Sequence, residues 1–199
     1  MPNITETEVK FYVPDLRAVE QRLQALGAHL RAPRVYERNV RYDDTGYSLE
    51  TTGSVLRLRQ DTRVRLTYKG KGRVENGILS RTEIEVEVSD FEKMELILNS
   101  LGYTSTLIYE KYRTTYELAG AEITLDEMPY GTFVEIEGEP DAIEHLVPQL
   151  ELTHVPRIPA SYTAIFQKLK LALNLDMHDL TFANFEGVRL PENFATIIA

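Results

Sequence analysis

The chain has 199 residues, no cysteine and a formal net charge of −9 at pH 7. This length suits a single domain, and the absence of cysteine excludes disulfides, thiolate catalysis and cysteine-ligated zinc. The negative charge argues against nonspecific binding to a nucleic acid polymer or an anionic membrane, because the summed field repels phosphate polymers. No apolar run approaches the roughly 20 residues that span a bilayer. No basic segment followed by an apolar one stands near residue 1, so we expect no secretory signal. These features predict a cytoplasmic protein.

Eight segments combine alternating apolar and polar residues with frequent Val, Ile, Thr and Tyr, which is typical of β-strands. Polar or glycine-containing turns bound them. In chain order, the predicted strands span residues 4–13, 34–43, 54–61, 63–70, 79–88, 106–118, 121–127 and 132–138. Most connections between them are short, so neighbouring strands are expected to pair antiparallel.

Two helices are predicted between the strands. The first begins after Asp15 and ends at Gly27, and the second begins after Asp90 and ends at Gly102. An aspartate at the N-cap accepts a hydrogen bond from a backbone N–H of the first turn, and glycine readily adopts the positive φ that ends many helices. Apolar residues at helical spacing in both segments predict that each helix packs one face on the sheet.

Two further helices and an extension follow the last strand. One helix follows Pro140 and runs to about Leu150, and the other begins at Ser161. Residues 174–199 contain Phe182, Phe185, Phe194, Ile197 and Ile198 without a clear period, and side chains of this size are expected to pack on the body of the protein or on a second subunit. We therefore expect a domain over residues 1–173 and a C-terminal extension over residues 174–199, and the apolar extension is compatible with a homodimer.

Charged residues alternate with apolar ones on strand after strand, so all the charges of a strand lie on one face. Glu6, Glu8 and Lys10 form one such row, and Arg57 and Arg59 form another. A single row is typical of a solvated strand surface, but six rows that carry both signs indicate one common polar surface. The predicted fold class is therefore α+β: an eight-stranded antiparallel closed β-barrel, a tunnel with a charged lumen, with helices packed on the outside.

The basic and acidic rows together predict a site for a metal–polyphosphate complex. Cations on adjacent strands repel one another unless an anion or facing carboxylates offset them. Guanidinium groups bind phosphate oxygens two at a time, and lysine acts as a point charge. Glutamate oxygens bind Mg²⁺ or Mn²⁺, and Mg²⁺ commonly shares its ligands with phosphates. The basic rows contain Arg57, Arg59, Arg63, Arg65, Lys69, Lys111 and Arg113. Arg81, Glu83, Glu85 and Glu87 form one row, and Glu135 and Glu137 form another carboxylate pair.

Other common catalytic patterns are absent from the sequence. The four histidines have no metal-ligand spacing, and there is no nucleophile elbow, P-loop or dinucleotide-binding glycine fingerprint. Gly70-Lys71-Gly72 lacks the preceding glycine and following hydroxyl of a P-loop. We expect it to form the tip of a flexible loop that could act as a lid.

The charged rows resemble the CYTH family, also called triphosphate tunnel metalloenzymes, from about Thr5 to Leu171. The family's Glu-x-Glu-x-Lys pattern is matched by Glu6, Glu8 and Lys10. The other matching segments, in chain order, are Leu56-Arg57-Leu58-Arg59, Thr67-Tyr68-Lys69-Gly70, Arg81-Thr82-Glu83-Ile84-Glu85, Glu110-Lys111-Tyr112-Arg113, Leu125-Asp126-Glu127 and Gly131-Thr132-Phe133-Val134-Glu135-Ile136-Glu137. The resemblance implies an eight-stranded antiparallel tunnel.

The resemblance also implies roles for individual residues. The implied substrate-binding residues are Lys10, Arg57, Arg59, Lys69, Lys111 and Arg113. The implied metal-binding residues are Glu6, Glu8, Glu135 and Glu137, with Glu83, Glu85 and Asp126 in supporting or metal roles. Of these, the candidate catalytic residues are Glu6, Glu8, Lys10, Lys111 and Arg113.

The resemblance implies an enzyme that uses Mg²⁺ or Mn²⁺ to process a small-molecule triphosphate. We favour hydrolysis of inorganic tripolyphosphate, thiamine triphosphate or a nucleoside triphosphate, because no nucleoside-reading motif is visible. The alternative is a class IV adenylyl cyclase that converts ATP to cyclic AMP and pyrophosphate, since Ser161-Tyr162 resembles the start of the C-terminal helix of the cyclase-like branch. In that case Tyr42, Tyr47 and Tyr162 are candidates for stacking on the base. A third reading, a non-catalytic binder of polyphosphate or of a nucleotide signal, does not account for two acidic pairs.

Overall fold

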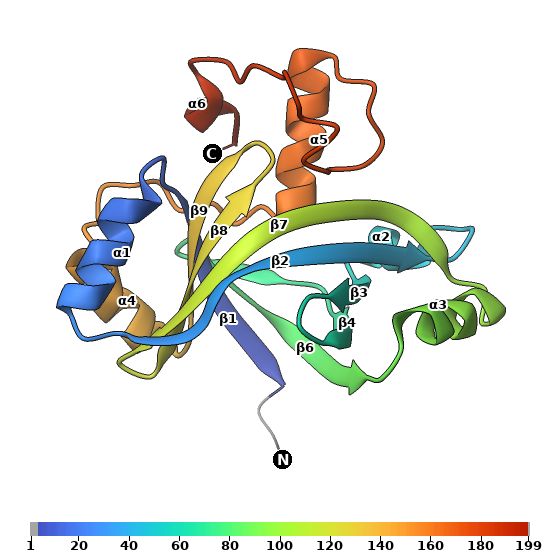
Figure 1. Ribbon diagram of the computed structural model, residues 1–199, viewed down its shortest axis with the longest axis horizontal. Coiled ribbons are helices and arrows are strands. Elements are labelled where there is room, and N and C mark those ends of the chain that lie inside the picture. The colour runs from blue at the N-terminus through green and yellow to red at the C-terminus, as the bar shows by residue number, and fades with distance from the viewer. Residues whose placement is uncertain (1–3, 199) are drawn as a thin grey trace.

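The computed structural model describes residues 4–198, which form nine strands and six helices (Figure 1). The strands are β1 (Thr5–Tyr12), β2 (His29–Asp43), β3 (Val55–Gln60), β4 (Val64–Lys69), β5 (Arg73–Glu75), β6 (Ile78–Val88), β7 (Thr104–Leu118), β8 (Ala121–Met128) and β9 (Gly131–Glu137). The helices are α1 (Leu16–Ala25), α2 (Ser48–Thr52), α3 (Phe91–Ser100), α4 (Pro140–Gln149), α5 (Tyr162–Leu173) and α6 (Phe194–Ile198).

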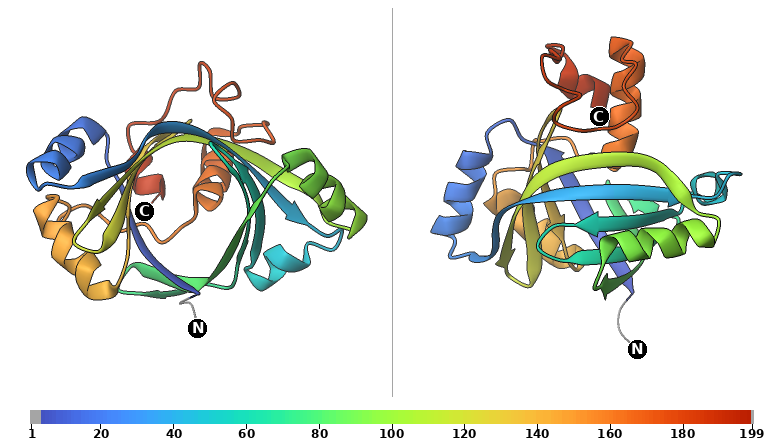
Figure 2. Two further views of the ribbon diagram at one scale, coloured as in Figure 1. Left: turned by 60° about the horizontal axis from the view of Figure 1, so that its bottom comes forward. Right: turned by 45° about the vertical axis from the view of Figure 1, so that its right-hand side comes forward.

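Eight of the strands close into a barrel. The strand order is β1-β9-β8-β7-β2-β3-β4-β6, and β6 pairs with β1 to complete the ring, which is seen nearly end-on in the left view of Figure 2. Neighbouring strands of the ring pair antiparallel, for example with Lys10 opposite Glu135 and Lys69 opposite Glu83. The short β5 pairs with β6 as a hairpin. The predicted eight-stranded closed barrel is therefore confirmed, and β5 is an additional strand.

The helices cover the outside of the barrel, as predicted. Helices α1 and α4 pack on the outer side of β1, β8 and β9, where Leu23 and Ile143 are fully buried with Ile136. Helix α3 covers β2 and β3 on another side, where Leu98 packs near Val40 and Leu58. Apolar side chains on the outward face of each strand thus meet helices, which leaves the charged rows to face the lumen.

Helices α1 and α3 begin and end where the sequence predicted. The Asp15 side chain accepts a hydrogen bond from Ala18 N, and the Asp90 side chain accepts one from Lys93 N. Each helix is followed by a glycine with positive φ, which is 76° at Gly27 and 90° at Gly102. The N-caps and the glycine stops are confirmed.

Some element boundaries differ from the prediction. Strand β2 begins at His29, five residues before the predicted 34, and its pairing with β7 shifts on both sides of Ala32. Pro33 cannot donate to a sheet ladder, so irregular pairing lets the strand continue through it. The loop after β4 also does not have its tip at Gly70-Lys71-Gly72. The tip is Asn76-Gly77, where both residues have positive φ and join β5 to β6.

The C-terminal extension packs on the barrel. Leu180 N donates to Ile108 O at 2.9 Å and Glu110 N donates to Leu180 O at 3.0 Å, which satisfies backbone groups of β7 beyond the end of β8. Phe185 and Phe194 are buried with α5 in a third apolar cluster. The apolar side chains of the extension therefore contact its own chain, and both the domain division and the homodimer stay predictions. Over residues 4–198, none of the helices has the length and apolar character needed to cross a membrane.

Candidate active site in the tunnel

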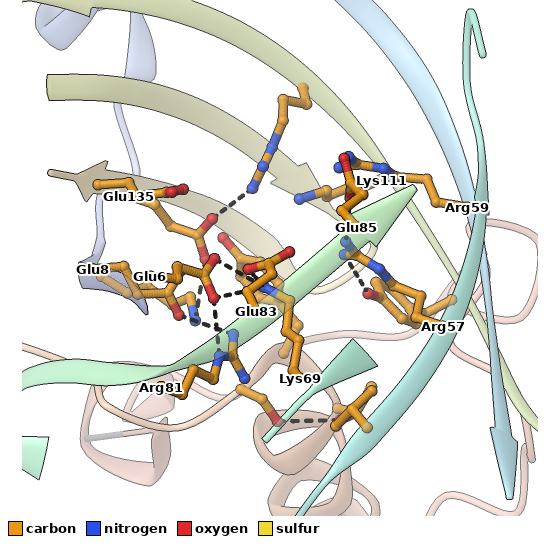
Figure 3. A pocket seen from close by; sticks show the side chains of 18 of the residues that line it. Glu6, Glu8, Arg57, Arg59, Lys69, Arg81, Glu83, Glu85, Lys111 and Glu135 are labelled. Carbon is orange, nitrogen blue, oxygen red and sulfur yellow. Dashed lines mark hydrogen bonds and ion pairs between the residues drawn. The ribbon is translucent and has the colours of Figure 1, made fainter. Parts of the chain in front are cut away.

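The lumen of the barrel holds a cavity of about 300 Å³ lined almost entirely by charged side chains. Because side chains alternate along each strand, the inward rows of the ring converge on this cavity (Figure 3). Every predicted site residue except Asp126 lines it: Glu6, Glu8, Lys10, Arg57, Arg59, Lys69, Glu83, Glu85, Lys111, Arg113, Glu135 and Glu137. The predicted residues therefore lie together, although their individual roles stay predictions.

One wall of the cavity is a network of carboxylates held by two cations. Lys69 Nζ lies 2.8 Å from both Glu6 carboxylate oxygens and 2.7 Å from Glu83 Oε2. Arg81 Nε donates to Glu6 at 3.0 Å and its Nη2 donates to Glu8 Oε1 at 3.4 Å. Burial raises the pKa of Glu6, but a hydrogen bond from Glu83 and the charges of Lys69 and Arg81 outweigh it and lower that pKa to about 2. Glu6 is therefore ionised.

The other carboxylates of this wall have raised pKa values. Burial, together with the negative charges of Glu6, Glu122, Glu8 and Glu83, raises the pKa of Glu137 to about 8. Burial and a hydrogen bond with Glu6 raise the pKa of Glu83 to about 7. Like charges held this close favour the protonated form. More carboxylates are gathered here than the neighbouring cations neutralise.

A second network joins the basic residues of β7 to Asp126. Arg113 Nε donates to Asp126 Oδ1 at 2.6 Å, and Lys111 Nζ donates to Asp126 Oδ2 at 3.0 Å. Arg113 also contacts Glu135, whose other oxygen lies 3.2 Å from Lys10 Nζ. Asp126 is fully buried behind the cavity wall, so it positions the two cations that face the lumen. Its predicted metal role is not tested by these contacts.

The arginines of β3 make longer contacts across the lumen from the carboxylate wall. Arg57 Nη2 lies 3.1 Å from Thr67 Oγ1, and Arg59 lies 3.5 Å from Glu37 Oε1 and 3.3 Å from Glu85 Oε2. Such distances are at the weak end for charge-assisted hydrogen bonds, which are usually shorter than 2.9 Å. Arg57 also lies 3.6 Å from Glu85, and Arg59 lies 3.7 Å from Asp61. Among the described residues, neither guanidinium makes an ion pair shorter than 3.3 Å, so both can turn toward a bound anion.

Several lumen residues were missing from the predicted site set. Arg81 lines the cavity, and so do Arg41 and Tyr109. The signal was present for Arg81 and Arg41, which continue inward rows: Arg81 precedes Glu83, and Arg41 follows Glu37 and Asn39 at a spacing of two.

Two of the three tyrosines suggested for base stacking lie elsewhere. The Tyr42 hydroxyl donates to Glu95 of α3 at 2.7 Å, so its ring faces outward. Tyr47 is half-exposed at the start of α2. Neither lines the cavity, whereas Tyr162 does, and Lys10 Nζ lies 4.3 Å from the centre of the Tyr162 ring. The expectation for Tyr42 and Tyr47 was wrong because Tyr42 points outward to α3 and Tyr47 is exposed at the N-cap of α2.

Comparison with known families identifies this arrangement. The model of the CYTH domain matches residues 5–156. The chain belongs to the CYTH family. The match covers the whole barrel and ends before α5, so Ser161 and Tyr162 lie outside it. The resemblance seen in the charged rows is thereby confirmed.

Individual relatives agree with this membership. A Methanocaldococcus jannaschii protein named as a candidate adenylate cyclase is 28% identical over 134 residues, which cover 66% of this CYTH chain and 75% of that protein. A solved structure from Pyrococcus horikoshii has a TM-score of 0.67 and 28% identity, and covers 82% of this chain and 99% of its own.

A third similar protein, from Hippeastrum, is described as a candidate adenylyl cyclase with a dominant triphosphatase activity. Its structure has a TM-score of 0.62 and 22% identity, with 81% of this chain and 95% of that chain covered. At this identity the likeness shows a shared fold.

The CYTH family is one of metal-dependent tunnel enzymes. The donor set of this chain fits a hard divalent cation, because it consists of carboxylate oxygens whose mutual repulsion a cation would relieve. Among residues 4–198, no three Asp, Glu or His side chains stand in a ready-made metal site. Lys69 and Arg81 instead occupy the Glu6 oxygens. A bound metal ion would therefore either displace Lys69 and Arg81 from the Glu6 carboxylate or bind to it alongside them.

Proposed function

We propose that this CYTH protein hydrolyses a small-molecule triphosphate with the help of Mg²⁺ or Mn²⁺. The observation that carries the proposal is the single cavity in which Lys10, Arg57 and Lys111 face the carboxylates of Glu6 and Glu135. A polyphosphate–metal complex presents both signs of charge, and this lumen complements both. An apolar ligand would leave the charged lining without partners.

The carboxylates would hold the metal and the cations would hold the phosphates. Glu6, Glu8, Glu135 and Glu137, with Glu83 beside them, would supply the oxygen ligands. When bound, the metal would supply charge neutralisation at the phosphate oxygens. Glu85 and Asp126, whose oxygens contact basic side chains, would support the phosphate-binding residues.

The basic residues can perform most of the remaining catalytic work by positioning. Arg57, Arg59, Lys69, Lys111 and Arg113 would bind the non-reacting phosphates and align the bond to be broken. Phosphoryl transfer needs chiefly alignment and charge stabilisation, and little covalent chemistry from the protein. Attack by water on the terminal phosphorus therefore requires no nucleophilic side chain, and Lys10, deep in the lumen beside Glu135, would stabilise developing negative charge.

The second candidate is cyclisation of ATP to cyclic AMP and pyrophosphate. It is supported by the name of the Methanocaldococcus relative and by the position of Ser161, Tyr162 and Thr163 at the cavity. It requires a nucleoside site as well as a phosphate site. Of the three tyrosines suggested for stacking, Tyr162 lines the cavity, and its ring already contacts Lys10. Hydrolysis requires no nucleoside site, so we favour it.

The test incubates the protein with Mg²⁺ or Mn²⁺ and, separately, tripolyphosphate, thiamine triphosphate and ATP. Release of orthophosphate supports hydrolysis, whereas cyclic AMP with equimolar pyrophosphate supports cyclisation. A Glu144→Gln variant is a suitable control, because Glu144 pairs with Arg157 on the outer surface. Absence of turnover with all three compounds and both metals would overturn the proposal.

A further inference from the structure

Asn39 lies on β2 between Glu37 and Arg41, which line two different cavities, and it is not itself among the residues that line either one. Its neighbours Arg38 and Val40 point outward to α3, since the Arg38 guanidinium lies 5.3 Å from the centre of the Phe91 ring and Val40 is in the apolar cluster of that helix. Asn39 therefore points inward. On the same inward row, Arg41 lines the larger cavity, and Glu37 lines a second cavity of about 220 Å³ at the other end of the lumen.

The Asn39 side chain is completely buried, and neither its Oδ1 nor its Nδ2 has a hydrogen-bond partner. A primary amide offers two donor hydrogens and an acceptor oxygen. Burying it without partners destabilises the folded protein, and nearly all buried polar side chains in proteins are paired. Within residues 4–198 the protein itself provides no partner for this amide, so it is available to a partner that enters the lumen.

The surroundings of Asn39 indicate which kind of partner fits. Its cross-strand neighbours are Arg59 on β3 and Tyr109 on β7. Arg57 Nε and Arg59 Nε are likewise buried without a hydrogen-bond partner. Arg59 Nε faces Asp61 Oδ2 at 3.7 Å, which is too long for a hydrogen bond. Glu37 Oε2 and Arg65 Nε are also without a hydrogen-bond partner in the part of the chain that the structure describes. Donors outnumber the one carboxylate oxygen in this set, and the positive charge of the guanidinium groups favours an anionic acceptor.

We propose that Asn39 Nδ2 donates a hydrogen bond to an oxygen of the innermost phosphate of the bound triphosphate, which rests on the proposed function. The long contacts of Arg59 to Glu37 and Glu85, at 3.5 and 3.3 Å, allow its guanidinium to turn and expose the amide to the cavity. Asn39 is then a substrate-binding residue that limits how far the phosphate chain enters the tunnel. A neutral amide suits this position because it donates to phosphate without the repulsion that a carboxylate would add.

The test compares wild type with Asn39→Leu and Asn39→Asp. Leucine has a similar size and no hydrogen-bonding group, and aspartate has the same shape with a negative charge. Binding of tripolyphosphate is measured by calorimetry with Mn²⁺ absent and present, and the Tm of each protein is measured without ligand. We expect Asn39→Leu to keep or raise the Tm, because two unpaired buried polar atoms are removed, and to weaken tripolyphosphate binding roughly tenfold. Asn39→Asp should weaken binding more strongly than Asn39→Leu.

Wild-type affinity in Asn39→Leu would overturn the inference and leave the amide a water or packing site. If Asn39→Leu does not fold, Asn39→Ala decides, because alanine removes the amide without adding a charge that competes for Arg59: wild-type affinity overturns the inference, and weakened binding supports it. Failure of the inference is distinguishable from failure of the proposed function. In the first case wild type binds and turns over tripolyphosphate and the variants match it, whereas in the second wild type itself neither binds nor hydrolyses it.

Discussion

The Tyr162 hydroxyl donates a hydrogen bond to Asp126 Oδ2 at 2.8 Å. This contact joins the first residue of α5, outside the segment that matches the CYTH domain, to the carboxylate that holds Lys111 and Arg113. The Tyr162 ring lies at the same time over Lys10. The C-terminal helix is thus part of the charge network of the lumen.

Replacing Tyr162 by phenylalanine should have a modest effect. Phenylalanine keeps the ring over Lys10 and removes one hydrogen bond to a carboxylate that retains two cations, which should lower the free energy of unfolding by about 1–2 kcal/mol. Tyr162→Ala also loses the buried ring and should cost about 3–5 kcal/mol. Urea unfolding of the two variants checks this, and equal losses would show that the ring contributes nothing.

Glu6→Gln should lower turnover by orders of magnitude. Glu6 is the ionised carboxylate at the centre of the acidic wall, contacted by Lys69, Arg81 and Glu83, and the amide that replaces it is a poor ligand for Mg²⁺. Steady-state assays over a range of Mn²⁺ concentrations measure the change. Wild-type turnover by Glu6→Gln, with the surface control Glu144→Gln also at the wild-type rate, would contradict the site assignment.

The metal-free protein should lose stability as the pH rises from weakly acidic to weakly basic. The pKa values of Glu83 and Glu137 are raised from 4.5 to about 7 and about 8, so the folded state binds more protons than the unfolded state in this range. The stability that these two carboxyl groups contribute is fully present at a pH below their pKa in the unfolded chain. It is lost as the pH rises through their pKa values in the folded protein.

The Tm in EDTA at about pH 5.5 and about pH 8.5 measures this loss, and a divalent cation should raise the Tm most at the higher pH. Glu137→Gln is the matched variant, because glutamine cannot ionise, and its Tm should fall less between the two conditions. An equal fall in wild type and Glu137→Gln would rule out Glu137 as a source of the pH dependence.

Arg57→Ala should weaken triphosphate binding and turnover together. The expected fall in kcat/KM corresponds to a loss of about 2–4 kcal/mol of transition-state stabilisation. Arg57 is nearly buried in the lumen, makes hydrogen bonds to Tyr109 and Thr67 and lies 3.6 Å from Glu85, so it has no short ion pair with a described residue and can bind a phosphate. Arg34→Ala is a matched control, because Arg34 also makes an ion pair, with Glu127, but on the exposed surface. A wild-type kcat/KM for Arg57→Ala would remove Arg57 from the site.

Glu37→Gln should bind tripolyphosphate more tightly and be less stable without it. Burial opposes ionisation, but the charges of Lys111, Arg113, Arg59 and Arg57 outweigh it and lower the pKa of Glu37 to about 2. This carboxylate therefore competes with phosphate for the same cations. Removing it takes one partner from Arg59 and from Lys111, which keep Glu85 and Asp126, at a cost of about 1–3 kcal/mol in the free energy of unfolding. Calorimetry and thermal unfolding test both effects; weaker binding would contradict the competition.

Much of the fold and of the site could be predicted from local patterns. Alternation with a period of two places Arg57 and Arg59 on one face of β3, and Glu135 and Glu137 on one face of β9. Because both signs recur on many strands and the other faces are apolar, a closed sheet with a charged lumen satisfies all the rows at once. The same pattern also contains Glu37 and Asn39, but without their neighbours it does not distinguish a lumen residue from a solvated one.

The sequence by itself determined which face of each strand every charged side chain occupies, because that follows from backbone geometry within the strand. Only the tertiary structure decided which charges meet. The register of the closed ring brings Asp126 to Lys111 and Arg113 behind the cavity wall, and the entry of α5 adds Tyr162 to them. It also leaves Asn39 buried without a partner. Such contacts join residues far apart in the chain, and local periodicity does not encode them.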